Sequence, residues 1–249
     1  MNRIVWITGA GKGIGRALAL AMARDGWTVA ASARTQADLL TLAAEAPTDT
    51  VHPYVLDVTD EKATALVLEE IGNALGQPDM AVLNAGTHLP MSAKDFSVET
   101  LRKLVDVNLM GTANGLAALL PLFRARGAGH VAVVASVAGY RGLPSSAAYG
   151  ATKAALINMC EALKPELDRD GVILSLVNPG FVETPLTDQN SFPMPFLITA
   201  DEAARIIYKG LQAKKFEIVF PWRFAIIMKI LRLLPQRLLF ALTSRMVSS

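Results

Sequence analysis

Tyr149 and Lys153 bring a phenol and an ammonium group together at a spacing that suits proton transfer. They are four residues apart in Tyr149-Gly150-Ala151-Thr152-Lys153, and on the helix expected for this stretch both side chains project from one face. A cation beside a phenol favours the phenolate and lowers the pKa of the tyrosine, as a general acid or base requires. The same pair is common in helices without a catalytic role, so its meaning depends on the surrounding sequence.

A glycine-rich loop near the start of the chain predicts a dinucleotide-binding site. Its sequence is Thr8-Gly9-Ala10-Gly11-Lys12-Gly13-Ile14-Gly15, and it lies between a short apolar run and a helical pattern. Glycines at such a turn let the backbone approach a pyrophosphate, which the N-terminus of the helix also attracts. A run of this kind can also be only a tight turn, but its place in the first βα unit favours the binding site.

The end of the second expected strand favours NADP(H) over NAD(H). An acidic residue there would bind the ribose 2′-hydroxyl of NAD, whereas a basic residue accommodates the 2′-phosphate of NADP. The strand ends in Ala31-Ser32-Ala33-Arg34, without a carboxylate. Arg34 can make a charge-assisted contact with a phosphate, and Lys12 supplies a second cation. The alternative is that both side chains are ordinary solvated charges.

The elements that must position these residues alternate between short β-branched runs and longer segments rich in alanine and leucine. This alternation is typical of βαβ units whose parallel strands end along one edge of a covered sheet. Strands are expected at 3–8, 28–33, 51–57, 80–84, 130–136, 171–178 and 216–220, and helices at 13–25, 36–46, 61–75, 98–126, 148–169 and 201–212. We therefore predict an α/β fold of the Rossmann type, with a doubly wound, seven-stranded parallel sheet.

The length of 249 residues suits one domain, and no linker or internal repeat divides it. We expect a dinucleotide-binding and catalytic part at residues 1–221. Residues 222–249 should form a basic, amphipathic helical tail of the same domain, in which Pro235 separates two helices.

Composition argues against several other classes of protein. The formal net charge of +2 is too small to suggest a nucleic-acid-binding protein. One cysteine, Cys160, and three scattered histidines suggest neither a disulfide nor a metal site, which fits the cytoplasm, and we interpret Cys160 as a packing residue. Although 52% of the residues are hydrophobic, no stretch of about 18 apolar residues lacks a charge, so we expect no membrane span.

Seven short motifs follow one another between Thr8 and Thr184. They are Thr8-Gly9-x-x-x-Gly13-x-Gly15, Asp57-Val58, Asn84-Ala85-Gly86, Val107-Asn108-Leu109-Met110-Gly111, Ala135-Ser136-Val137-Ala138-Gly139, Tyr149-x-x-x-Lys153, and Asn178-Pro179-Gly180 with Thr184 beyond it. In this order and spacing the chain resembles the classical short-chain dehydrogenase/reductase family. One departure from the family pattern is that many relatives have serines where this chain has Gly11 and Lys12.

The resemblance implies roles for the matching residues. Tyr149 would exchange a proton with the carbonyl or alcohol oxygen, and Ser136 would hold the same oxygen. Lys153 would lower the pKa of Tyr149 and bind the nicotinamide ribose, while Asn108 would position a water that relays protons to Lys153. Cofactor contacts would come from Gly9, Gly11, Lys12, Gly13, Ile14, Gly15, Arg34, Asp57, Val58, Asn84, Ala85, Gly86, Tyr149, Lys153, Pro179, Gly180 and Thr184.

Three of these residues also allow a purely structural interpretation. Asp57 could be the N-cap of the next helix, Asn108 a packing residue inside a helix, and Ser136 the end of a strand. The full set of motifs favours the functional roles.

Two stretches outside the βαβ pattern bear on the substrate and partners. Residues 185–199, which by the resemblance close over the substrate, contain Leu186, Phe192, Pro193, Met194, Pro195, Phe196 and Leu197. They predict a hydrophobic substrate, unless they pack against the following helix. The tail has no acidic residue after Glu217 but has five basic residues among apolar ones, as an interfacial helix on an anionic membrane would. Packing on the sheet edge, on a second subunit or at the substrate mouth are the alternatives.

The favoured function is an NADP(H)-dependent oxidoreductase that interconverts a carbonyl and an alcohol. We expect it to reduce a hydrophobic ketone, aldehyde or lipid-like substrate, and the resemblance implies a homodimer or homotetramer. A regulator that binds NADP(H) without turnover is the alternative, which the complete set of Asn108, Ser136, Tyr149 and Lys153 disfavours.

Overall fold

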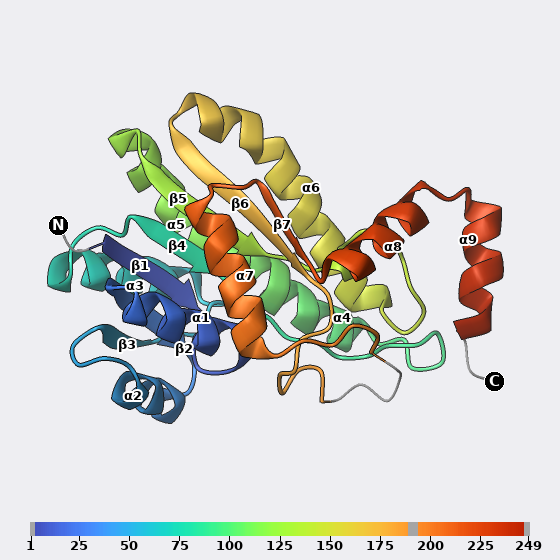
Figure 1. Cartoon of the computed structure of the whole chain (residues 1–249), viewed down its shortest axis with the longest axis horizontal. Helices are drawn as coiled ribbons and strands as arrows, with labels where there is room; N and C mark the ends of the chain where they lie inside the picture. The colour runs from blue at the N-terminus through green and yellow to red at the C-terminus, as the bar shows by residue number, and fades with distance from the viewer. Residues whose placement is uncertain (1–2, 189–193, 247–249) are drawn as a thin grey trace.

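A seven-stranded parallel sheet with the order β3-β2-β1-β4-β5-β6-β7 lies at the centre of the computed structural model, which describes residues 3–188 and 194–246 (Figure 1). The strands are β1 (Arg3–Thr8), β2 (Trp27–Ala33), β3 (Val51–Val55), β4 (Met80–Leu83), β5 (Gly129–Val134), β6 (Val172–Pro179) and β7 (Glu217–Phe220). All seven expected strands are confirmed, with ends that differ by at most two residues. The central strands are apolar at nearly every position because helices cover both faces of the sheet.

Helices form a layer on each side of the sheet. One layer contains α1 (Gly13–Arg24), α2 (Gln36–Glu45) and α7 (Ala200–Gln212), whose apolar side chains share a buried cluster with the sheet. The opposite layer contains α3 (Glu61–Ala74), α5 (Gly111–Arg126) and α6 (Ala147–Arg169), with a second cluster. The strand order reverses between β1 and β4, and ligands of such sheets bind beyond the carboxyl ends of the strands at that point.

The prediction of one continuous α-helix at 98–126 is wrong, because a stretch of π-helix interrupts it. The segment consists of α4 (Val98–Leu104), a π-helical stretch at Val105–Met110 and then α5. The π-helical stretch contains Asn108, whose side chain is hydrogen-bonded to two neighbouring segments rather than to its own helix. Such wide turns occur often at functional sites, and hydrophobic periodicity alone does not distinguish them from α-helix.

The C-terminal tail forms two helices, α8 (Trp222–Leu233) and α9 (Gln236–Thr243), which are separated at Leu234 and Pro235 as expected. Figure 1 shows α8 beside the end of β7 and α9 standing apart at the far end of the molecule. The structure describes no helix that is both long and apolar enough to cross a membrane within residues 3–188 and 194–246. The functional division at residue 221 stays a prediction.

Candidate active site

The glycine loop connects β1 to α1 at the reversal point of the sheet. Gly9 and Gly13 have φ angles of +66° and +55°, in the left-handed region that side chains disfavour. Asn84, at the end of β4, fixes the loop from below, because its Nδ2 donates to the carbonyl oxygens of Thr8 at 3.0 Å and of Gly9 at 3.2 Å. The first turn of α1 contains no acidic residue, so its N-terminus can attract an anion.

Gly15 does not line the cleft but allows α1 to pack closely against the glycine loop. A Cβ atom there would lie 2.3 Å from the carbonyl oxygen of Gly9 and 2.5 Å from Nδ2 of Asn84. The missing side chain therefore lets the helix approach the loop and its asparagine brace. Gly15 belongs to the motif for a packing reason, whereas the other assigned residues of the loop line the cleft.

The end of the cleft beside β2 contains two cations, one without an ion pair among the described residues and one with a carboxylate partner. Arg34 is exposed, lines the cleft and forms no ion pair with any residue that the structure describes. Lys12, by contrast, lies 3.4 Å from the carboxylate of Asp38, which also lines the cleft. This partner in α2 was not expected from the sequence, and it leaves Arg34 as the more available cation at this end.

Asp57 and Val58 also line this end of the cleft. Asp57 accepts hydrogen bonds from the backbone N–H and the hydroxyl of Thr59, at 3.0 and 2.8 Å. The N-cap of α3 is Asp60, whose Oδ1 accepts from the N–H of Ala63. The alternative interpretation of Asp57 as that cap is therefore wrong.

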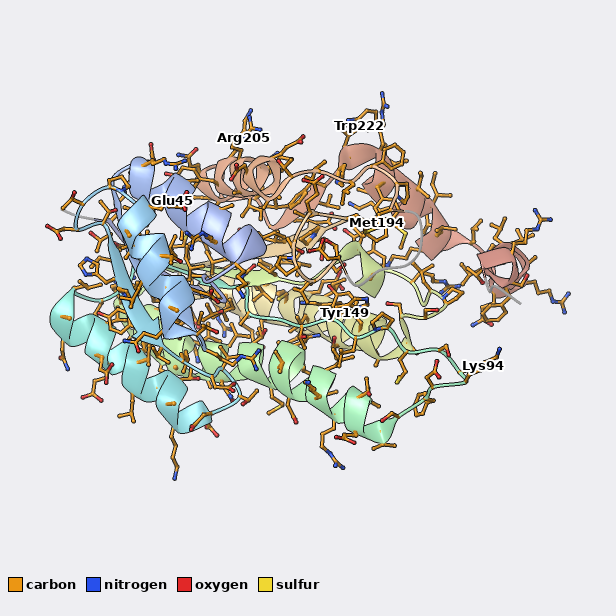
Figure 2. All side chains as sticks on the ribbon, turned by 90° about the horizontal axis from the view of Figure 1, so that it is seen from below. Glu45, Lys94, Tyr149, Met194, Arg205 and Trp222 are labelled. Carbon is orange, nitrogen blue, oxygen red and sulfur yellow. The ribbon has the colours of Figure 1, made fainter. Side chains whose placement is uncertain are left out.

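Ser136, Tyr149 and Lys153 line the other end of the cleft, where Figure 2 labels Tyr149. Ser136 follows β5, and its hydroxyl contacts the carbonyl oxygen of Pro179 at 3.3 Å and accepts from the N–H of Ala138. Lys153 is almost fully buried, donates to the carbonyl oxygen of Val134 at 2.9 Å, and lies 5.7 Å from the centre of the Tyr149 ring. The helical spacing of Tyr149 and Lys153 thus places both on the cleft side of α6, as predicted.

Burial controls the charges of this pair in the chain alone. Burial raises the pKa of Tyr149 above its ordinary value, and the interaction with the Ser136 hydroxyl opposes this only partly. Burial also lowers the pKa of Lys153 to about 8. Removal from water thus favours the neutral form of both groups, and the effect of the Lys153 charge on the pKa of Tyr149 stays a prediction.

The predicted cofactor residues fit a dinucleotide as a set. One continuous cleft runs from Arg34 past the glycine loop to Tyr149, and all of the assigned residues line it except Gly15 and Asn108. Backbone approaches the cleft where glycine is required, since a Cβ at Gly13 would lie 2.9 Å from Thr184. Within residues 3–188 and 194–246, no three side chains of the metal-binding types gather into a metal site.

The family model described as short chain dehydrogenase matches residues 3–193. The chain belongs to the short-chain dehydrogenase family. It is an oxidoreductase of that family, and an uncharacterized oxidoreductase of Myxococcus xanthus is 39% identical to it over 246 residues, 98% of this chain and 97% of that protein.

Solved structures of short-chain dehydrogenases share the fold. An alcohol dehydrogenase of the archaeon Thermococcus sibiricus, complexed with 5-hydroxy-NADP, is 28% identical, with a TM-score of 0.80 over 88% of this chain and 96% of that one. A short-chain dehydrogenase/reductase of Burkholderia phymatum in complex with NAD has a TM-score of 0.83 over 92% of each chain. At 23% identity, the second likeness concerns the fold alone.

Asn108 holds two segments of this short-chain dehydrogenase together instead of lining the cleft. Its Oδ1 accepts from the N–H of Thr87 at 2.7 Å, and its Nδ2 donates to the carbonyl oxygen of Thr87 and to the hydroxyl of Thr152. The side chain is completely buried. It fixes the loop after β4 against α6, one residue from Lys153, so its side chain acts here as a brace.

His88 lies against Tyr149 in the candidate site and was not predicted from the sequence. Its ring meets the Tyr149 ring edge-on, with centroids 4.6 Å apart and an angle of 74°. The one feature of the sequence that could have indicated His88 is its position two residues after Gly86, in the loop that follows β4. A lone histidine in a loop carries too little information to be assigned to a site without the fold.

At the Tyr149 end of the cleft, aromatic side chains from three segments pack together behind the residues that line it. Pro179, Gly180 and Thr184 line the cleft after β6, with Pro185 and Leu186 beyond them. Phe181 stacks on Phe224 of α8 with centroids 5.3 Å apart, and Phe196 of the expected lid lies 6.4 Å from Phe224. The lid residues Phe192 and Pro193 lie outside the described residues.

Proposed function

We propose that this short-chain dehydrogenase is an NADP(H)-dependent reductase of hydrophobic carbonyl compounds, with Tyr149 as proton donor. The observation that carries the proposal is one cleft with Arg34 at one end and Ser136, Tyr149 and Lys153 at the other. The cofactor, when bound, supplies the hydride, and the residues of the chain orient the reactants and handle the proton.

Each residue has a role that follows from its position. The Ser136 hydroxyl donates to the carbonyl oxygen of Pro179 in the chain alone, and by rotating away from it would donate to the substrate oxygen as negative charge develops there. The raised pKa of Tyr149 keeps its proton available for that oxygen at neutral pH. Lys153 holds a positive charge beside the tyrosine at pH values below about 8 and thereby stabilises the phenolate left after transfer.

NADP(H) is favoured by the charges at the adenosine end. Arg34 stands beyond β2 and can contact a 2′-phosphate, while no carboxylate follows Ala33 directly to bind a 2′-hydroxyl. Two carboxylates, Asp38 and Asp57, line the cleft. Asp38 is already paired with Lys12. We propose a cytoplasmic location and a homodimer or homotetramer for this enzyme, and light scattering of the purified protein tests the assembly.

A hydrophobic substrate is supported by the lining of the mouth. Pro185 and Leu186 line the cleft, and Phe224, which stacks on Phe181, packs against Gly180 behind the cleft wall. Apolar walls with a few polar groups at the reacting centre favour an apolar carbonyl compound over a polar one.

The test is the oxidation of NADPH and NADH against carbonyl compounds graded from small and polar to long-chain and apolar. We expect NADPH to be consumed fastest with apolar compounds, and Tyr149→Phe to abolish turnover while NADPH binding remains. NADPH binding without reduction of any compound in the series would contradict the reductase and favour a regulator that binds NADP(H).

A further inference from the structure

The tail helices carry a large share of the exposed apolar side chains. Eighteen large apolar side chains are exposed among the described residues, and eight of them belong to the tail. We call these eight the tail face: Trp222, Ile226, Ile227, Ile230, Leu233, Leu238, Phe240 and Leu242. A concentration of this kind marks a surface that contacts something apolar.

In α8, four residues of the tail face lie on one side of the helix, separate from the side that packs on the protein. Trp222, Ile226, Ile230 and Leu233 follow one another at steps of four, four and three residues, which places them along one side. The opposite side carries the buried Ala225 and Met228, with the half-buried Phe224. One half of an apolar helix is therefore packed, and the other half is uncovered. Trp222 lies at the outer margin of the molecule in Figure 2.

The packed side of α8 touches the substrate end of the cleft. A Cβ at Gly180 would lie 2.8 Å from the ring of Phe224, so the helix approaches the backbone of the cleft wall directly. Phe224 also stacks on Phe181. A surface that receives the tail face would consequently lie next to the mouth of the active site.

The charges of the tail divide into two groups. Lys229 pairs with Glu217 and Arg232 lies 4.0 Å from Glu161, so these cations hold α8 to the rest of the protein. The exposed Arg223, Arg237 and Arg245 form no ion pair within residues 3–188 and 194–246. Arg223 lies over the ring of Trp222, at the edge of the tail face.

We propose that the tail face docks on the surface of an anionic lipid bilayer. Apolar side chains next to arginines, with an aromatic ring between them, suit a helix that lies in the plane of the lipid headgroups. The 12 residues of α8 span only about 18 Å, which fits that orientation. The three available arginines attract anionic headgroups, and the tail has no acidic residue that would repel them.

Charge argues against a second copy of the chain as the occupant. In a two-fold symmetric contact the same surface meets itself, so Arg223 and Arg237 would lie against a tail that has no acidic residue to pair with them. The acid nearest in sequence, Glu217, is already engaged by Lys229 and by the hydroxyl of Tyr140. A bilayer supplies the negative charge that the tail itself lacks.

This docking has a consequence for the substrate that rests on the proposed function. With α8 between the bilayer and the cleft mouth, an apolar carbonyl compound could pass from the lipid to Tyr149 beside Phe224 and the cleft-lining Leu186. The substrate class would then be lipid-soluble carbonyl compounds.

The first test is co-sedimentation of the full-length protein with vesicles, which requires no enzymatic activity. Vesicles of phosphatidylcholine alone are compared with vesicles in which half of the lipid is phosphatidylglycerol. We expect binding only to the anionic vesicles, and a loss of about tenfold or more with Arg223→Gln/Arg237→Gln/Arg245→Gln. The control variant Lys62→Gln/Arg205→Gln/Lys209→Gln removes three exposed charges elsewhere and should bind like the wild type.

The apolar contribution is tested with Ile226→Asn/Ile230→Asn/Leu233→Asn. These side chains are exposed, so the fold should persist, and unchanged thermal unfolding and NADPH binding check this. Leu40→Asn/Leu66→Asn, exposed apolar positions in α2 and α3, is the matched control. Binding of the wild type to neither vesicle, or equal loss in tail and control variants, would overturn the proposal. So would a change of oligomeric state caused by the tail variant alone, because the tail face would then cover a second copy.

The substrate consequence has a separate readout. Reduction of a long-chain carbonyl compound dissolved in anionic vesicles should fall at least several-fold in the triple asparagine variant, whereas reduction of a short water-soluble one should not change. Vesicle binding without this difference would refute lipid-phase access but leave docking intact. If neither the wild type nor the triple asparagine variant reduced any carbonyl compound, the proposed function itself would be refuted.

Discussion

Selectivity for NADPH should depend on Arg34 more than on Lys12. Arg34 is exposed at the cleft without an ion pair in the described part of the chain, whereas Lys12 is held 3.4 Å from Asp38. A hydrogen bond to a charged group contributes about 1.5–3 kcal/mol, and exposure reduces this toward the lower value. Arg34→Ala should therefore raise the Kd for NADPH about tenfold, since ~1.4 kcal/mol corresponds to that factor, and leave the Kd for NADH almost unchanged.

Asp38 supplies the opposite change. Its carboxylate lines the cleft and neutralises Lys12, so Asp38→Asn should free that ammonium and remove a negative charge from the phosphate site. We expect the Kd for NADPH to fall several-fold and the Kd for NADH to stay constant. Ala33→Asp/Arg34→Ala should reverse the preference, because it places a carboxylate where a ribose 2′-hydroxyl would lie.

Fluorescence titration of each variant with both cofactors, at low and at high salt, measures these effects. The NADPH-specific changes should shrink at high salt, because ionic strength screens exposed charges. An equal loss of both cofactors in Arg34→Ala, or an unchanged NADPH/NADH ratio in Ala33→Asp/Arg34→Ala, would refute the assignment.

Three further predictions concern pH and packing. Burial lowers the pKa of His130 from 6.5 to about 4, so the unfolded chain binds its proton more readily, and the free energy of unfolding should fall by about 3 kcal/mol between pH 6.5 and 4. Denaturant titration of His130→Gln should show a weaker loss across that range, and an identical loss would contradict this origin. Because Lys153 has a pKa of about 8, carbonyl reduction should decline as pH rises through 8, and the kcat profile of Lys153→Arg should lack that decline. Gly15→Ala should cost about 2–3 kcal/mol of stability, because its Cβ would overlap the Gly9 carbonyl, while Gly142→Ala, with open space around it, should be nearly neutral in thermal melts.

The strands and the glycine loop were predictable because local sequence determines them. Strands covered on both faces are nearly continuous apolar runs, and the glycines of the first βα turn occur where positive φ angles are needed. Tyr149 and Lys153 were predictable for a similar reason, since a spacing of four on a helix places two side chains on one face. In each case the residues that decide the structure are neighbours in the chain.

Contacts between distant segments were not predictable in this way. Asp38 reaches Lys12 from the next helix, His88 meets Tyr149 from a loop, and Asn108 joins that loop to α6. Each pair is separated by at least 26 residues in sequence except that of Asn108 with Thr87, which is separated by 21. Such pairings depend on the three-dimensional arrangement, so the sequence indicates only the residue types. The π-helical stretch around Asn108 belongs to the same class of feature.

The basic tail shows how this difference affects functional interpretation. From sequence, Lys229 and Arg232 counted toward a cationic membrane surface, but the structure pairs them with Glu217 and Glu161. Glu217 is also bonded to Tyr140, whose hydroxyl accepts from Nδ2 of Asn178 immediately before the cleft residue Pro179. Lys229 therefore connects α8 to the start of β7, and Arg232 connects it to α6. If the tail binds a bilayer, its electrostatic attraction must come from the remaining three arginines, whereas the paired cations add to the apolar packing that holds α8 against the protein.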